Sequence, residues 1–360
     1  MTLLYILVGV VIINVLGIRI FRKLGVLDKP GNDLKNTRKP VPTILGVFTY
    51  LGFFGIVAIL FPEYLHNNLF RGLMIGAFPI VLVQLLDELR YIDKIKFSLP
   101  SWVRLLSHIL GAILAVYIGG FQGQEILIGS WKWIMPQWFF ALFFVVWSIL
   151  CINAINRFDG IYAQASGVSS VGFLTIFLLI KYVVFQHFTV FTEANLVTLH
   201  LVENLSLVLF ALSLVSTVVE YKPLALLRDV GIMFFGFSLA YLSVAWGAKI
   251  GTIVVALSLV IFDAIWVGFY RLFVIKKSPL KGDYTHLHHR LLWLGWNRKE
   301  IRAFVWIFSL IMMILMLMQQ ANRINKIWIF LIMAIVFFSV NYYLFLVKKL
   351  PCGLNLKKNN

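Results

Sequence analysis

Long apolar stretches alternate with short polar loops along this 360-residue chain. A helix needs about 20 mainly apolar residues to cross the hydrocarbon core of a membrane. Eleven stretches meet that length, with centres near Val11, Gly52, Pro79, Leu110, Phe144, Leu174, Val208, Phe237, Leu259, Leu310 and Met333. The pattern predicts an all-α polytopic membrane protein with about eleven transmembrane helices.

The composition agrees with this pattern. Hydrophobic residues make up 61% of the chain and charged residues 13%, whereas about half of a typical soluble domain is apolar. No internal repeat or long soluble insertion interrupts the stretches. We therefore predict a single integral membrane domain over residues 1–347 and a short basic cytoplasmic tail over residues 348–360.

The positions of Lys and Arg predict the orientation. Arg19, Arg22 and Lys23 follow the first span and no basic stretch precedes it, so we interpret it as a retained helix rather than a signal peptide. Lys and Arg collect on the cytoplasmic side, which places the N-terminus outside, the C-terminus in the cytoplasm and the protein in the cell (inner) membrane. Only six of the 32 Lys and Arg residues then lie at outer ends: Arg71, Lys132, Lys181, Lys249, Arg323 and Lys326.

The formal net charge of +17 indicates cytoplasmic loops that attract anionic lipid head groups, phosphate-bearing substrates or both. The basic residues are scattered over five loops and a tail without a recognisable nucleic-acid-binding module, so no nucleic-acid partner is expected. Cys151 and Cys352 both fall on the reducing side, where a structural disulfide is not expected.

The predicted outer loops are short, and we assign no chemistry to them. One of them, "GGFQGQEILIGSWKWIMPQW" over residues 119–138, combines glycines with alternating residues, a pattern typical of a small β-hairpin. We expect this hairpin at the outer interface.

The predicted inner loops hold the unusual polar residues. The first, "LDKPGNDLKNTRKPVPTILG" over residues 27–46, carries Lys35, Arg38 and Lys39 among three prolines. Its cations serve either as a topology signal or as an anion site flanked by hydrogen-bonding side chains. The sequence alone leaves both interpretations open.

Carboxylates mark two of the inner helix ends. The third span ends with Asp87 and Glu88 beside Arg90. Because like charges repel, one member of this pair either has a raised pKa or shares a cation. Alternatively, the pair marks a helix end that reaches water. Asp229 opens the eighth span, where it suits the positive end of a helix dipole, so a simple capping role is also open.

The fifth span runs into "CINAINRFDGIYAQASG", residues 151–167. Asn153, Asn156 and Asp159 recur at intervals of three, which places them near one face of a helix that Gly160 would end. A polar stripe on a membrane helix is costly unless it faces a cavity or a partner. The stripe therefore favours a functional site over a structural one.

Three histidines fall within four positions of "GDYTHLHHRLLWLG", residues 282–295. His286, His288 and His289 would serve as zinc ligands, as a basic topology patch, or as donors that hold a diphosphate together with Arg290. Zinc is disfavoured because no cysteine is nearby, and a basic patch because histidine is mostly neutral at pH 7. The diphosphate interpretation needs the fewest assumptions.

These inner ends combine two kinds of group. Carboxylates and amides suit a hard cation such as Mg²⁺, which retains waters and binds substrate phosphates. Guanidinium, ammonium and imidazole groups suit the phosphates themselves. Phosphoryl transfer needs both kinds and little covalent chemistry from the protein.

The collinear order of "DKP…RKPVPT", the acidic pair, "NAINRFDG", "DVG" and "HLHHRL", over about residues 27–295, resembles the polyprenyl-phosphate N-acetylhexosamine-1-phosphate transferase superfamily. That superfamily includes the undecaprenyl-phosphate transferases that initiate common-antigen and teichoic-acid assembly, and phospho-MurNAc-pentapeptide translocase. The resemblance implies an integral membrane phosphotransferase that moves a sugar-1-phosphate, with an N-acetylhexosamine expected, from a UDP-sugar to a polyprenyl (undecaprenyl) phosphate. UMP would leave, Mg²⁺ or Mn²⁺ would be the cofactor, and the product would begin a cell-envelope glycan. A homodimer is left open.

The resemblance also implies roles for single residues. The catalytic candidates are Asp87, Glu88 and Asp159, and the metal-binding candidates are Asp229 and Asp159. The substrate-binding candidates are Lys35, Arg38, Lys39, Asn153, Asn156, Arg271, His286, His288, His289 and Arg290.

Four positions depart from the superfamily pattern. Glu88 replaces the second aspartate of the acidic pair, and Tyr162 replaces an acid or amide after "DG". Arg228 and Ile232 replace a glycine and a small hydroxyl residue around Asp229. A catalytically impaired relative that binds lipid or nucleotide sugar as a scaffold is therefore the alternative function. A transporter is disfavoured because charges within the spans are scarce.

Overall fold

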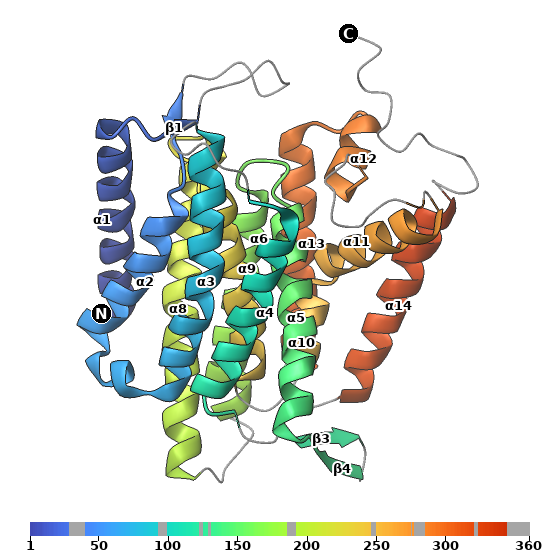
Figure 1. Ribbon diagram of the computed structural model, residues 1–360. Helices are drawn as coiled ribbons and strands as arrows, with labels where there is room; N and C mark the ends of the chain where they lie inside the picture. The colour runs from blue at the N-terminus through green and yellow to red at the C-terminus, as the bar shows by residue number, and fades with distance from the viewer. Residues whose placement is uncertain are drawn as a thin grey trace.

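The computed structural model describes residues 1–28, 40–92, 99–121, 125–128, 131–185, 192–245, 250–274, 276, 285–319 and 323–343. Helices make up most of this part of the chain (Figure 1). They are α1 (Thr2–Lys23), α2 (Gly46–Leu60), α3 (Asn68–Tyr91), α4 (Ser101–Ile118), α5 (Gln137–Arg157), α6 (Gln164–Leu178), α8 (Glu193–Tyr221), α9 (Arg228–Val244), α10 (Ile250–Ala256), α11 (Ser258–Phe269), α12 (Leu287–Trp293), α13 (Arg298–Met318) and α14 (Arg323–Tyr342). Shorter helical segments cover Pro62–His66, Leu179–Val184 and Tyr270–Val274.

The predicted class, an all-α polytopic membrane protein, agrees with this structure. A helix covers each of the eleven predicted centres, and seven helices in the described residues are long and apolar enough to cross a membrane. The number of crossings, the side that each end faces, and the limits of the membrane domain and tail stay predictions.

The ninth apolar stretch forms two helices instead of one. Leu257 leaves the helical conformation (φ −101°, ψ 17°) between α10 and α11. α11 then runs across the bundle toward α14 (Figure 1). The sequence did not indicate this break, because Leu257 and its neighbours are ordinary apolar residues.

Helix α9 lies at the centre of the bundle. Every residue from Val230 to Val244 is buried, and α9 packs against α2, α3, α5 and α6. A helix that is apolar on all sides belongs in such a core. The polar residues at its first turn are therefore held at one end of the bundle by the surrounding helices.

Two glycines let the chain approach the start of α9 closely. A Cβ atom on Gly46 would lie only 2.0 Å from the backbone nitrogen of Gly231. The Leu45 and Gly46 N–H groups donate to the Leu226 and Leu227 carbonyls at 2.9 and 3.2 Å. These bonds fix the segment that follows the first predicted inner loop against the turn that begins α9.

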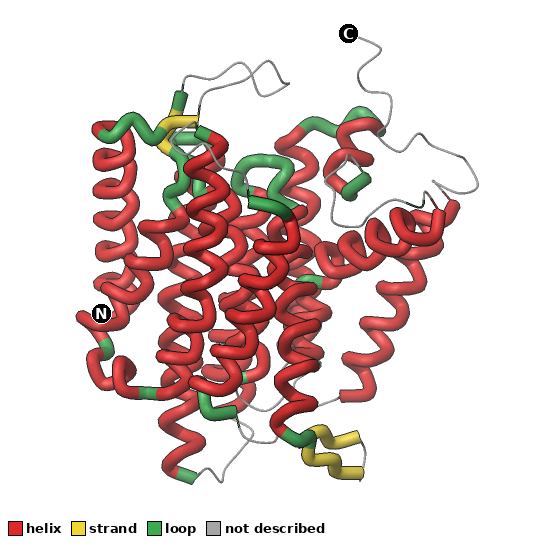
Figure 2. The backbone as a smooth tube through the Cα atoms, viewed as in Figure 1, coloured by secondary structure: helices red, strands yellow, loops and turns green. Residues whose placement is uncertain are grey.

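In the part of the chain that the structure describes, strands lie at the two ends of the helical bundle (Figure 2). β3 (Glu125–Ile128) and β4 (Trp131–Ile134) pair as an antiparallel hairpin, which confirms the hairpin predicted in residues 119–138. At the other end, β1 (Leu27–Asp28) and β2 (Val41–Pro42) form a two-residue antiparallel pair that the sequence did not predict. This pair closes the base of the first loop.

Candidate functional site

A cavity of about 280 Å³ opens where α3 ends and α9 begins. Ten residues from five helices and the adjoining turns line it. They are Asp87, Glu88, Arg104, Asn156, Asp159, Tyr162, Glu220, Leu226, Arg228 and Asp229. Five of them are predicted site residues from separate segments of the chain: Asp87, Glu88, Asn156, Asp159 and Asp229.

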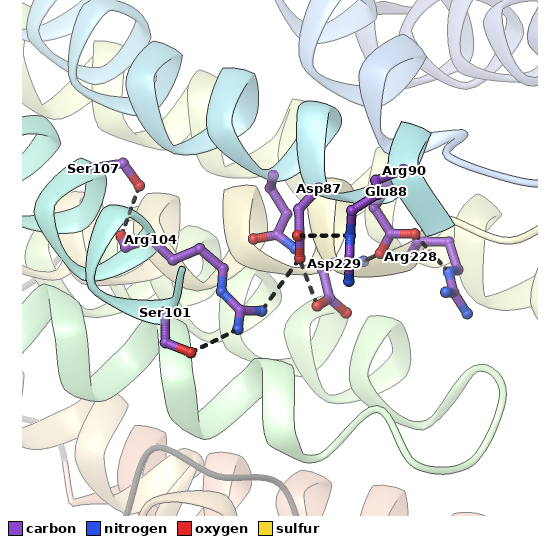
Figure 3. A network of polar contacts seen from close by, with 9 residues as sticks. Asp87, Glu88, Arg90, Ser101, Arg104, Ser107, Arg228 and Asp229 are labelled. Atoms are coloured by element: carbon purple, nitrogen blue, oxygen red, sulfur yellow. Dashed lines mark hydrogen bonds and ion pairs between the residues drawn. The ribbon is translucent and has the colours of Figure 1, made fainter. Parts of the chain in front are cut away.

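Glu88 is held by the first residues of α9. The Arg228 Nε donates to Glu88 Oε2 at 3.0 Å, and the Asp229 backbone N–H donates to Glu88 Oε1 at 3.4 Å (Figure 3). Two departures from the superfamily pattern, Glu88 and Arg228, therefore contact each other. Arg228 also interacts electrostatically with the Asp229 carboxylate, which bears on the metal-binding role predicted for Asp229.

Asp87 has different cationic partners. The Arg104 Nη1 on α4 lies 3.4 Å from Asp87 Oδ2, and the Arg90 Nε lies 3.9 Å from Asp87 Oδ1 (Figure 3). The two adjacent carboxylates are thus stabilised by separate guanidinium groups, which relieves their mutual repulsion. Each carboxylate of the pair therefore has a guanidinium partner of its own.

Asp229 does not form the side-chain cap that the sequence left open. Leu227 occupies the N-cap position of α9, which has no side-chain cap bond. The Asp229 Oδ2 instead accepts a hydrogen bond from Gln84 Nε2 on α3 at 3.2 Å. Its carboxylate lines the cavity, where the first turn of α9 favours negative charge.

The predicted polar stripe on α5 is only partly at the cavity. Asn153 donates from Nδ2 to the Ile149 carbonyl of its own helix at 2.8 Å and is not among the lining residues. The Asn156 side chain lies beside Asp229, but its buried Nδ2 has no hydrogen bond of normal geometry within the described residues. A buried donor in this condition needs a further partner, and a substrate acceptor in the cavity would supply one.

Glu220, near the end of α8, is a cavity residue that the sequence analysis missed. It is 2% exposed. It accepts hydrogen bonds from the Leu227 N–H and the Ser166 hydroxyl, both at 2.9 Å. The available signal was a carboxylate that follows a long apolar run near the end of the helix, where it is costly without a partner.

Glu220 connects two turns that bear site residues. One turn contains Ala163, which has a left-handed φ of 66°, and the other contains Arg228 with φ 61°. The Ala163 N–H also bonds the Glu220 carboxylate. Non-glycine residues with a left-handed φ store strain that the surrounding structure must offset. The hydrogen bonds to Glu220 provide part of this stabilisation.

We expect Glu220→Ala to destabilise the protein and to slow its reaction. Two buried backbone N–H groups would lose their acceptor, at about 1–3 kcal/mol each. The melting temperature in detergent and the rate of product formation measure the two effects. Glu220→Gln, which keeps one acceptor oxygen, should lie between the wild type and the alanine variant. An alanine variant with wild-type melting and rate would contradict the proposed support.

Three predicted substrate-binding residues, Arg271, His286 and Arg290, lie in a buried network and are not among the lining residues. Asp263 on α11 binds His286 Nδ1 at 2.8 Å, accepts from the Leu287 N–H at 2.9 Å and pairs with Arg290. Arg290 also bonds Asn341 on α14. These contacts fix α12 to α11 and α14.

Arg271 joins the same network. Its Nη2 lies 3.1 Å from Thr285 Oγ1 and 3.4 Å from His286 Nε2, and the residue is 1% exposed. The structure therefore does not bring Arg271, His286 or Arg290 to the cavity lining. The buried Asp263 carboxylate binds His286 and Arg290 directly, and Arg271 contacts His286. Asp263 is the partner that sequence spacing could not identify.

His288 is the histidine that the structure places against a site-bearing turn. A Cβ atom on Gly160 would lie 1.9 Å from His288 Nε2, and neither ring nitrogen has a hydrogen-bond partner among the described residues. Burial, followed by the nearby His289, holds the pKa of His288 well below its usual value. The His289 ring centroid lies 4.1 Å from that of His288. A neutral imidazole thus borders the turn that carries Asp159.

Lys35, Arg38 and Lys39 lie outside the described residues. Within the described residues, no group of three or more His, Cys, Asp or Glu side chains is arranged to hold a metal ion. The cavity nevertheless has five carboxyl groups and two guanidinium groups. Asp229, Asp159 and the Asn156 oxygen are hard donors, and Mg²⁺ commonly binds one or two carboxylates together with substrate phosphates. The donor set fits such an ion.

Comparison with known proteins shows which proteins this chain resembles. The profile of glycosyl transferase family 4 matches residues 70–247, which span α3 to α9. The chain is 27% identical to phospho-N-acetylmuramoyl-pentapeptide-transferase of Latilactobacillus sakei, over 68% of this chain and 74% of that protein. It is 22% identical to undecaprenyl-phosphate alpha-N-acetylglucosaminyl 1-phosphate transferase of Escherichia coli K12, over 90% of this chain and 85% of that protein.

Proposed function

This chain belongs to the polyprenyl-phosphate N-acetylhexosamine-1-phosphate transferase superfamily and is a phosphotransferase, and we propose that it transfers a sugar-1-phosphate from a UDP-sugar to undecaprenyl phosphate. An N-acetylhexosamine is the proposed sugar. The reaction occurs at the cytoplasmic end of a multi-pass inner-membrane protein with eleven spans, its N-terminus outside and its C-terminus inside. The product begins a cell-envelope glycan. A homodimer has no support from the comparisons and is not part of the proposal.

The observation that carries this proposal is the convergence of five predicted site residues on one cavity. In the proposed reaction, an oxygen of the lipid phosphate attacks the β-phosphorus of the UDP-sugar. The bond from that phosphorus to the bridging α–β oxygen breaks, and UMP leaves. The product is a sugar diphospholipid. Such a transfer depends mainly on positioning and charge stabilisation.

The cavity residues would divide this work. Asp87 and Glu88 would position the lipid phosphate, each held by its guanidinium partner. Asn156 and Asp159 would form the wall for the nucleotide sugar, where the buried Asn156 amide can donate to it. His288 would border the sugar side as a neutral group, and Lys35, Arg38 and Lys39 would approach from the first loop.

Asp229 and Asp159 would hold Mg²⁺ or Mn²⁺, which when bound offsets the charge of the phosphates. This need follows from the lining, because carboxyl groups outnumber guanidinium groups there by five to two. A diphosphate entering the cavity without an added cation would meet net negative charge. The Gln84 bond keeps the Asp229 carboxylate oriented at the first turn of α9.

Purified protein with Mg²⁺, undecaprenyl phosphate and a panel of labelled UDP-sugars tests the proposal. We expect one donor to give a lipid-linked product and an equal amount of UMP, and no product when the lipid or the metal is omitted. Lack of product with every donor would contradict the proposal. Binding of UDP-sugar or lipid without turnover would instead support the catalytically impaired scaffold.

A further inference from the structure

Arg228 begins α9 in a conformation that does not favour arginine. Its φ is 61°, in the left-handed region that glycine adopts without steric cost. A glycine at this position would relieve the strain. Backbone strain of this kind concentrates at functional sites. The presence of an arginine at a position that suits glycine therefore requires an explanation.

The Arg228 side chain contributes to the cavity lining beside Asp229. Its Nε donates to Glu88 Oε2 at 3.0 Å, and the side chain is 22% exposed. A guanidinium has five N–H donors in a planar fork. It can therefore bond a carboxylate with one part and a phosphate with another.

Cations are few among the cavity lining residues. Arg104 and Arg228 are the two cations among the described lining residues. Arg104 contacts Asp87 at 3.4 Å and Ser101 at 3.3 Å. The strained backbone of Arg228 is the feature that distinguishes it from Arg104, since an ordinary structural ion pair could be formed from an unstrained position.

We propose that Arg228 binds a phosphate group of a substrate, and that Glu88 positions its guanidinium for this contact. The proposal rests on the proposed function, and it adds a phosphate ligand at a position where the superfamily pattern has glycine. The phosphate belongs either to the diphosphate of the nucleotide sugar or to the lipid. Both sources present the same anionic oxygens, and binding measurements can separate them.

The test compares Glu88→Gln with the double variant Glu88→Gln, Arg228→Gly. The glutamine keeps an oxygen that can accept the Arg228 Nε–H hydrogen bond, and it avoids leaving a buried carboxylate without a cation in the double variant. Glycine adopts the φ of residue 228 freely. The two proteins therefore differ in the guanidinium and little else. Dissociation constants are measured for UDP against uridine, and for undecaprenyl phosphate against undecaprenol.

We expect the double variant to bind one of the two phosphate ligands about tenfold more weakly than Glu88→Gln, as loss of a hydrogen bond to a charged group predicts. The matched ligands without phosphate should bind equally to both variants. Weaker UDP binding assigns the contact to the nucleotide, and weaker undecaprenyl phosphate binding assigns it to the lipid. Equal binding of both phosphate ligands would overturn the proposal.

A single variant, Arg228→Lys, gives a second readout in the wild-type background. It keeps the charge but not the planar fork, so the affinity for the same ligand should fall by a smaller factor. These are binding measurements, so they test Arg228 even if the wild-type protein fails to form product. Failure of the proposed function and failure of this inference therefore give different results.

Discussion

Asp229→Asn should reduce UMP release by about a hundredfold or more, because a bound metal ion contributes several kcal/mol of charge stabilisation that this carboxylate would anchor. Asparagine keeps the size of the side chain and an oxygen that can accept the Gln84 hydrogen bond, which is 3.2 Å long in the wild type. Asparagine is also well tolerated at helix starts. The rate of UMP release measures the loss, and the melting temperature should stay close to the wild-type value.

Glu63→Gln is the matched control for this change. It also removes one negative charge, but Glu63 is exposed in the short helix Pro62–His66, outside the cavity lining. Its rate should equal that of the wild type. An Asp229→Asn variant that retains most of its activity would show that the Asp229 carboxylate serves only the start of α9, and would contradict its assignment as a metal ligand.

Asp263→Ala is expected to cause the largest loss of stability, about 3–5 kcal/mol, because it leaves the buried charge of Arg290 without its carboxylate partner. Asp263 and Arg290 are 1% and 6% exposed, respectively. The His286 ring and the Leu287 N–H would also lose their acceptor. A fall in the melting temperature of the detergent-solubilised protein measures the effect.

Asp263→Asn separates charge from shape at the same position. It retains an acceptor oxygen and the side-chain volume, so its melting temperature should fall less than that of Asp263→Ala. If α12 positions His288 against the Gly160 turn, both variants should also lower the rate of product formation. Wild-type melting of Asp263→Ala would show that the network does not stabilise the contact of α12 with α11 and α14.

The sequence predicted the helices, and it predicted that polar residues at several helix ends lie close together. Apolar runs of about 20 residues dictate membrane helices, and helices that cross in alternate directions return every second loop to the same end. Asp87, Asn156 and Asp229 come from such ends and line one cavity. Predicting the helices and assigning alternate loops to one end both succeed without knowing which helices are neighbours.

The partners of these residues could not be predicted in the same way. Glu220 bonds Leu227 and Ser166, and Asp263 bonds His286, through contacts that depend on packing between helices. Helical spacing placed Asn153 with Asn156, but the Asn153 side chain bonds its own backbone. The periodicity of a helix gives the face on which a residue lies, and does not give the hydrogen bond that its side chain selects.

Arg228 illustrates the same limit. The sequence identified it as a departure from the superfamily pattern, and identified Glu88 as another. Only the structure shows that the two side chains form an ion pair and that Arg228 adopts a φ of 61°. The pairing therefore connects two substitutions that were independent observations in the sequence.

The position of the β-phosphate after reaction tests the central claim most directly. The donor found in the UDP-sugar panel is prepared with ³²P in its β-phosphate and incubated with undecaprenyl phosphate, Mg²⁺ and the protein. Transfer of sugar-1-phosphate predicts that the label moves into the lipid fraction and that the released UMP is unlabelled. Label recovered in UDP would show transfer of the sugar without its phosphate and would contradict the proposed reaction, as would label that stays entirely in the donor.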